Sequence, residues 1–188
     1  MEKKHIITIA GKPGSGKSTA SKGLAGLLDY KHFSSGDFFR AVGKERGIDV
    51  FQTNLVAEKE KEIDELVDQK LRDLGKAEDN MIIDSRMAWH WMSYSFRVYL
   101  DLEISEAAER IFKNLETERM EAEHIPDTPE EYAERLQKRL DSETKRYMNL
   151  YQANPYNTKN YDLVVDTAKH SPEEVQQIIL QAYKNWLQ

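Results

Sequence analysis

The chain contains no cysteine, which excludes disulfide frameworks, thiolate zinc sites, iron–sulfur clusters and cysteine nucleophiles. It has no apolar run near the roughly 20 residues that span a membrane, and the run Ile6–Ala10 is too short for the core of a signal peptide. Positive charge is not in excess, since the chain has 27 Lys and Arg and 33 Asp and Glu. The resulting net charge of −6 disfavours a nucleic-acid-binding surface. These absences favour a cytoplasmic globular protein with no membrane or nucleic-acid partner.

The remaining composition is that of a folded domain. A length of 188 residues suggests one domain with small insertions and suffices for a sizeable core without cross-links. Apolar runs typical of strands alternate with segments of helical periodicity. Strands are expected over 6–10, 31–34, 81–84, 96–101 and 161–166. Helices are expected over 17–28, 37–46, 55–74, 105–115, 129–151 and from 172 nearly to the end.

Short apolar strands joined by helices favour parallel pairing with right-handed crossovers, and therefore an α/β fold. In such folds ligands bind beyond the carboxyl ends of the strands. The polar residues that directly follow each strand are therefore the candidates for a functional site. No repeat or linker divides the chain, so we expect a single domain over 1–188.

The segment Gly11–Ser18 reads GKPGSGKS and fits the phosphate-loop pattern G-x-x-x-x-G-K-[ST] in full. Its glycines allow backbone N–H groups to turn inward around an anion, and the helix beginning near Lys17 adds the positive end of its dipole. Lys17 can then reach the β- and γ-phosphates of ATP, and Ser18 can ligate Mg²⁺ together with Asp84, which ends the third strand. The alternatives are an ordinary glycine turn and a solvated strand end. The pattern predicts ATP as co-substrate, Mg²⁺ as cofactor and a cradle formed by Gly11, Lys12, Pro13, Gly14, Ser15, Gly16, Lys17 and Ser18.

Arginines follow two of the expected strand ends. Arg40 lies one turn inside the helix that Ser35 opens, and Arg86 comes two residues after Asp84. Because a planar guanidinium binds two phosphate oxygens at once, this pair beside a triphosphate site indicates a second, anionic substrate. The alternative for each is a surface salt bridge, which is the stronger interpretation for Arg40 taken alone.

Three further arginines lie on the expected helix 129–151. Arg135, Arg139 and Arg146 are separated by four and seven residues, which places them on one helical face. Such a face can close on a transferring phosphoryl group if the charged segment 116–127, bounded by proline, acts as a mobile lid. The alternative is a solvated face paired with Glu131, Glu134 and Glu143.

Two carboxylates of the expected helix 55–74, Asp64 and Asp68, lie one turn apart. A carboxylate only accepts hydrogen bonds, and cytosine offers a 4-amino donor, so the pair is a candidate for reading a cytosine base. The alternative is a solvated face in a segment rich in Glu and Lys.

The order of these motifs resembles that of the nucleoside monophosphate kinases. The resemblance is carried by the phosphate loop through Thr19, by SGDFFR at 35–40 and by IIDSR at 82–86. Within that family the chain is most similar to the archaeal-type cytidylate kinases, through KERGID at 44–49 and through SETKRY and YDLVVDT further on. The resemblance covers essentially the whole chain. This chain departs from the family pattern at two places. Ser85 stands where the family usually has a glycine, and the segment 87–92 is about one residue longer than its counterpart in the family.

The resemblance implies ATP-dependent phosphorylation of CMP, or of dCMP, by a monomer. The implied fold is a three-layer P-loop sandwich with a five-stranded parallel sheet, a helical acceptor-binding insertion at about 36–76 and a lid at about 116–146. The resemblance implies that Thr19 and Arg110 contact ATP. It implies that Lys17, Arg139 and Arg146 stabilise the transferring phosphoryl group. Acceptor contacts are implied for Ser35, Asp37, Arg40, Asp64, Asp68 and Arg86.

Two other functions stay open on the sequence. One is phosphorylation of a different nucleoside monophosphate, such as AMP or UMP, or of a small anionic metabolite. The other is a nucleotide-binding regulatory module with little turnover, which would need loops that sense the γ-phosphate and a partner surface.

Overall fold

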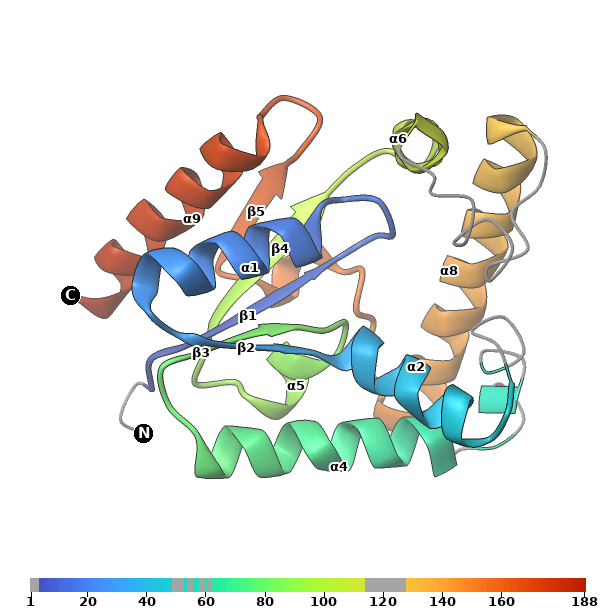
Figure 1. Ribbon diagram of the computed structural model, residues 1–188, viewed down its shortest axis with the longest axis horizontal. Helices are drawn as coiled ribbons and strands as arrows, with labels where there is room; N and C mark the ends of the chain where they lie inside the picture. The colour runs from blue at the N-terminus through green and yellow to red at the C-terminus, as the bar shows by residue number, and fades with distance from the viewer. Residues whose placement is uncertain (1–3, 49–52, 54–55, 58–59, 61, 114–127) are drawn as a thin grey trace.

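A computed structural model of the protein describes residues 4–48, 53, 56–57, 60, 62–113 and 128–188. Its centre is a five-stranded sheet with the order β2-β3-β1-β4-β5, in which every neighbouring pair is parallel (Figure 1). The strands are β1 (Ile6–Gly11), β2 (Lys31–Ser34), β3 (Met81–Asp84), β4 (Phe96–Asp101) and β5 (Leu163–Asp166). The expected parallel α/β fold is therefore confirmed.

Helices cover both faces of the sheet. The helices of this part of the chain are α1 (Lys17–Leu28), α2 (Ser35–Glu45), α4 (Glu62–Ala77), α5 (Ala88–Trp91), α6 (Ile104–Lys113), α8 (Pro129–Tyr151) and α9 (Pro172–Leu187), with a 3-10 turn η1 (Thr158–Asn160). None of these helices combines the length and apolar character that a membrane crossing needs, within the residues described.

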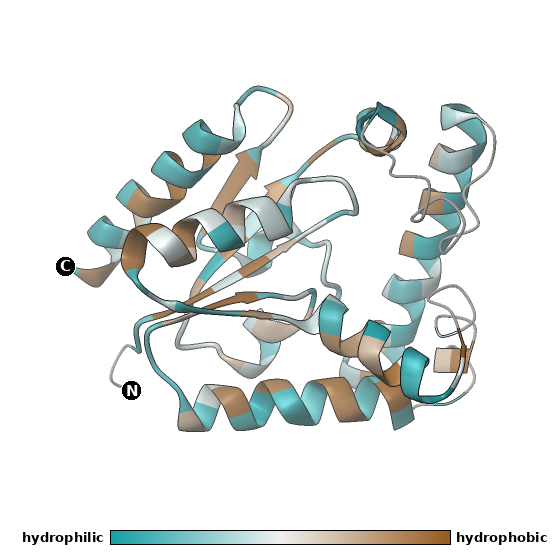
Figure 2. Ribbon diagram, in the orientation of Figure 1, coloured by the Kyte–Doolittle hydropathy of each residue, from teal (hydrophilic) through white to brown (hydrophobic). Residues whose placement is uncertain are grey.

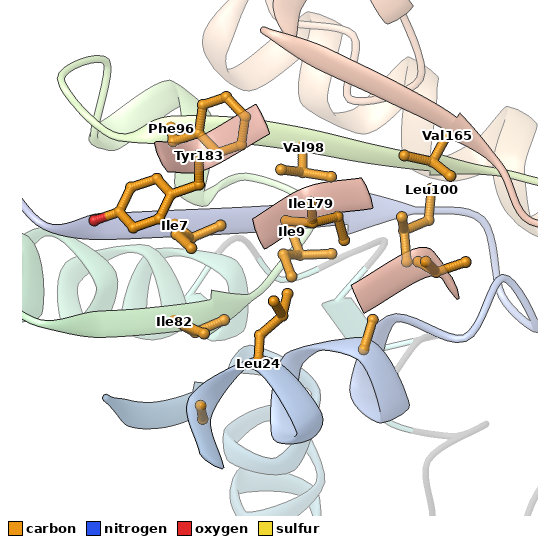
Figure 3. Close-up of a cluster of buried hydrophobic side chains, with 13 residues drawn as sticks. Ile7, Ile9, Leu24, Ile82, Phe96, Val98, Leu100, Val165, Ile179 and Tyr183 are labelled. Atoms are coloured by element: carbon orange, nitrogen blue, oxygen red, sulfur yellow. The ribbon is translucent and has the colours of Figure 1, made fainter. Parts of the chain in front are cut away.

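The alternation of side chains along β1 explains the layers. Ile7 and Ile9 pack with α1 and α9 in the larger core cluster (Figure 3). Ile6 packs with α4 and α5 on the opposite face. All three side chains are fully buried. The central strands β1, β3 and β4 are thus largely apolar, while polar residues gather on the outer side of the long helices (Figure 2).

Several element boundaries differ from those expected. The helix α2 begins at Ser35 rather than Asp37 because the Ser34 hydroxyl accepts a hydrogen bond from the backbone N–H of Asp37, 3.4 Å away. The last strand begins at Leu163, two residues later than expected. The short elements α5 and η1 were not foreseen, since four and three residues are too few for a periodic signal. The segment 116–127, expected to be a mobile lid, lies outside the described residues, as does most of 55–61.

One prediction tests how α1 is oriented. Leu24 is fully buried in the larger core cluster, whereas Leu27, three residues further along the helix, is 52% exposed. Leu24→Ala should lower the free energy of unfolding by about 2–5 kcal/mol, because it leaves a cavity between helix and sheet. Leu27→Ala on the same helix is the control and should change it by about 0.5 kcal/mol or less. Chemical denaturation of both variants measures this, and equal losses would contradict the orientation.

Candidate active site

The carboxyl ends of the strands open into a cavity of about 570 Å³. It is lined from the phosphate loop, α2, α4, the turn after β3, α6 and α8. Of the residues singled out from the sequence, those that line it are Pro13, Gly14, Gly16, Lys17, Ser18, Thr19, Ser35, Arg40, Asp64, Asp68, Asp84, Arg86, Arg110, Arg139 and Arg146. Those that do not are Gly11, Lys12, Ser15, Asp37 and Arg135.

The phosphate loop has the backbone shape that an anion nest requires. Gly14 and Gly16 have φ values of 77° and 82°, in the left-handed region that glycine adopts readily. A Cβ at Gly14 would also lie 3.0 Å from the carbonyl oxygen of Ala107, so a side chain there would press against α6. The Nζ of Lys17 donates a hydrogen bond to the carbonyl of Lys12 at 2.8 Å, which holds the lysine over the loop.

Lys12 points out of the cavity instead of into it. Its Nζ forms an ion pair with Asp101 at 2.9 Å and donates to the carbonyl of Leu102 at 3.1 Å. Lys12 therefore fastens the phosphate loop to the end of β4, and its own contribution to an ATP site comes through the backbone.

A hydroxyl and a carboxylate meet beside the loop. The Ser18 hydroxyl donates a hydrogen bond to Asp84 Oδ2 at 2.7 Å, and Asp84 is buried at the end of β3. These oxygen donors fit Mg²⁺, which keeps several waters and binds substrate phosphates rather than a full protein cage.

Lys17 is partly buried among charges of both signs. Burial lowers the pKa of Lys17 to about 8, an effect that the carboxylate of Asp84 opposes and that Arg86 and Arg139 reinforce. The ammonium stays mostly charged at neutral pH. Because it has few water contacts, it is well placed to interact strongly with phosphate oxygens.

Three cavity arginines are each held by a buried carboxylate. The Nε of Arg86 lies 2.8 Å from Glu143, and the Nε of Arg139 lies 2.9 Å from the other oxygen of the same carboxylate. The Nε of Arg146 lies 2.8 Å from Asp64 on α4. Burial alone would raise the pKa of Glu143, but the arginine charges outweigh it and lower that pKa to about 2.

The other carboxylate of α4 has different partners. Asp68 accepts a hydrogen bond from the indole Nε1 of Trp91 at 3.1 Å through Oδ1, and it is 3% exposed. Its Oδ2 is buried and accepts no hydrogen bond from any described residue. Burial raises the pKa of Asp68, whereas the hydroxyl of Tyr151 and the indole of Trp91 counteract the shift. Asp68 therefore belongs to the cavity lining, with its carboxylate buried beside Trp91 and Tyr151.

Two predicted binding arginines are less deeply set. Arg110 lines the cavity, and its guanidinium donates to the carbonyl of Thr167 at 2.6 Å. Arg40 also lines the cavity, but its side chain is half exposed and pairs with Asp37. Asp37 does not line the cavity; its side chain is exposed and pairs with Arg40.

The departure at Ser85 has a simple structural explanation. Ser85 has no positive φ, so its backbone does not require glycine. Its N–H donates to the carbonyl of Ile9 at 3.0 Å, which extends the pairing of β3 with β1, and its hydroxyl accepts from the N–H of Met87 at 3.3 Å. The serine thus begins the turn that leads into α5.

Sequence reasoning missed three residues around the cavity. Glu143 was considered only as a surface ion-pair partner, and Tyr156 and Trp91 were given no role. The hydroxyl of Tyr156 donates a hydrogen bond to Glu143, and Trp91 binds Asp68. The one signal available was the spacing of four residues between Arg139 and Glu143, which brings their side chains together on a helix.

Comparison with known proteins identifies the family. A family model described as an AAA domain matches residues 10–146. The cytidylate kinase of Halobacterium salinarum is 35% identical over 180 residues, which cover 94% of this chain and 88% of that protein. The cytidylate kinase of Natronomonas pharaonis is 36% identical over 177 residues, covering 93% and 86%. Shikimate kinase from Aquifex aeolicus shares the fold, with a TM-score of 0.59, 21% identity and 96% coverage of both chains. The chain therefore belongs to the AAA-domain family of P-loop proteins and, within it, to the nucleoside monophosphate kinases that include the archaeal cytidylate kinases.

Proposed function

We propose that the protein transfers the γ-phosphoryl group of ATP to CMP, and to dCMP as a related acceptor. The observation that carries the proposal is that one cavity is lined both by the phosphate loop with Lys17 and by two further cations, Arg40 and Arg86. The loop suits the donor triphosphate, and the two arginines suit the phosphate of the acceptor.

Phosphoryl transfer in such a cavity depends on positioning and charge. Lys17, Arg139 and Arg146 would offset the charge that spreads over the oxygens of the transferring group. Ser18 and Asp84 would hold Mg²⁺, which contributes further charge neutralisation when bound. The acceptor phosphate has a second pKa near 6, so it is an anionic nucleophile at neutral pH and needs no general base. Burial of the arginines excludes water that would otherwise compete with the acceptor.

The base preference is assigned to Asp68. Its Oδ2 is a buried acceptor without a hydrogen bond among the described residues, and the 4-amino group of cytosine is a donor of the matching kind. Uracil presents a carbonyl at the same position, which a carboxylate would repel. Two relatives that carry the name cytidylate kinase, each more than a third identical to this chain, support the same acceptor.

The residues that line the cavity suggest roles for two further regions of the chain, 36–76 and 116–146. We assign 36–76, through α2 and α4, to acceptor binding, since Arg40, Asp64 and Asp68 all come from it. The lid proposed at 116–146 is described only from Thr128 onward, and its Arg139 already lines the cavity with Lys17. We assign the protein a monomeric state.

A panel of acceptors tests the function. With ATP and Mg²⁺, we expect kcat/KM for CMP to exceed that for UMP, AMP and GMP by at least about tenfold, which is the discrimination that one specific hydrogen-bonded contact to a base provides. The panel includes shikimate as a small anionic metabolite. Transfer chiefly to another acceptor would replace CMP in the proposal, and slow ATP hydrolysis with no transfer would favour a regulatory module.

Asp68→Asn tests the base contact. The amide offers N–H donors as well as an oxygen, so it can bind the O4 of uracil, which a carboxylate repels. We expect kcat/KM for CMP to fall and the CMP-to-UMP ratio to drop by about 10- to 100-fold. Asp73→Asn, on the exposed part of the same helix where Asp73 bonds Gln69, is the control and should keep the wild-type ratio. An unchanged ratio in Asp68→Asn would remove Asp68 from base recognition.

Asp64 gives the reaction a pH dependence. Burial raises the pKa of Asp64 to about 6; the charge of Arg146 opposes this shift and that of Asp68 reinforces it. As the pH falls through 6, Asp64 gains a proton and holds Arg146 less firmly, so kcat should fall. At pH 5 roughly a tenth of Asp64 remains ionised.

The matched control is Asp64→Asn, which cannot titrate at this position. Its kcat should be lower than that of the wild type at pH 7.5, and the wild-type-to-variant ratio should shrink by about tenfold or less at pH 5. Titration of the substrate phosphates affects both proteins and cancels in the ratio. A ratio that is the same at both pH values would contradict the role of Asp64.

A further inference from the structure

Glu143 joins three separate parts of the chain at the cavity wall. Its carboxylate, 3% exposed, contacts Arg86 from the turn after β3 at 2.8 Å and Arg139 from α8 at 2.9 Å. It also accepts a hydrogen bond from the hydroxyl of Tyr156, in the turn that follows α8. No base-reading or metal-binding role explains a carboxylate placed between two phosphate-binding arginines.

The geometry of these contacts is informative. In both arginines the nearest atom to the carboxylate is Nε, on the side of the guanidinium. Both side chains line the cavity, and in each the carboxylate lies closer to Nε than to the terminal edge formed by Nη1 and Nη2. That edge is the fork that binds two phosphate oxygens at once.

We propose that Glu143 is a positioning residue for phosphoryl transfer, which sets Arg86 and Arg139 side by side with their terminal edges toward the phosphates. The two guanidinium groups share the cavity with Lys17, so without a carboxylate between them they repel one another. Tyr156 fixes the carboxylate in turn, because its hydroxyl binds the oxygen that also faces Arg86. The proposal rests on the proposed roles of Arg86 and Arg139, and it adds the group that aligns them.

A merely structural role would have different consequences. If Glu143 only fastened α8 to the rest of the protein, its loss would lower stability while the folded fraction kept normal kinetics. If it aligns the arginines, the folded variant is impaired in its use of the acceptor and in the transfer step. ATP affinity, which rests on the phosphate loop and Lys17, stays close to normal in that case.

Glu143→Gln is the first test, because it keeps the shape and removes the charge. With the acceptor that the panel ranks first, we expect kcat/KM to fall by about 10- to 100-fold, as is usual when an orienting partner is lost. The dissociation constant for ATP should stay within about twofold. Folded Glu143→Gln protein with wild-type kinetics would overturn the proposal. The wild-type panel tests the proposed function on its own, so the two failures are distinguishable.

A double-mutant cycle separates alignment from stability. Once Arg139→Met has removed one of the aligned groups, Glu143→Gln should lower kcat/KM by a much smaller factor than it does in the wild type. Losses that simply multiply in the double variant would show that the two residues act independently, and would overturn the proposal.

Tyr156→Phe provides a test that does not depend on the folding of Glu143→Gln. It removes one hydroxyl and leaves both ion pairs, so we expect a fall in kcat of about 3- to 10-fold. The control is Tyr94→Phe, since the Tyr94 hydroxyl donates to the carbonyl of Gly75 at 2.7 Å, outside the cavity wall. Tyr94→Phe should keep wild-type kinetics. If Glu143→Gln does not fold, equal kinetics in the two tyrosine variants would overturn the proposal.

Discussion

Repulsion between cations is the constraint on which the rest of this structure depends. A site for two phosphate-bearing substrates needs several positive groups within a few ångströms, and in a cavity poor in water those groups repel strongly. The protein meets this constraint with buried carboxylates: Asp84 near Lys17, Glu143 between Arg86 and Arg139, and Asp64 against Arg146. In the three arginines the carboxylate lies nearest to Nε, at 2.8–2.9 Å.

The sheet order determines which of these groups can meet. Because β3 lies beside β1 and pairs Ile9 with Asp84, the carboxylate that ends β3 falls next to the helix that begins after the phosphate loop. The turn after β3 then brings Arg86 into the lining of the same cavity. The helix α8 completes the wall from a distant part of the chain, and its buried ion pairs hold it against α4 and the β3 turn.

Local features of this fold could be predicted from the sequence, and long-range contacts could not. The phosphate loop and most strands could be predicted from short-range patterns, because a glycine-rich turn between an apolar run and a helix is compatible with few other conformations. The exposure of Leu27 was not predictable, since the sequence does not distinguish an apolar residue beside the buried face of a helix from one within that face. The partnership of Glu143 with Arg86 joins residues 57 positions apart, and spacing showed only its contact with Arg139. The role of Trp91 was equally hidden, because α5 is too short to have a periodic pattern.

The two carboxylates of α4 show how one helix links recognition to transfer. They lie one turn apart, but Asp64 contacts Arg146 whereas Asp68 contacts Trp91. An acceptor base that binds Asp68 would therefore press on the same turn of helix that holds an arginine of the transfer site. A base that does not fit would leave that turn unsupported, so a poor acceptor would lose both affinity and the alignment of Arg146. If Asp68 reads the acceptor base and Arg146 contacts the transferring group, as proposed, the rigidity of a single helical turn couples selectivity to rate.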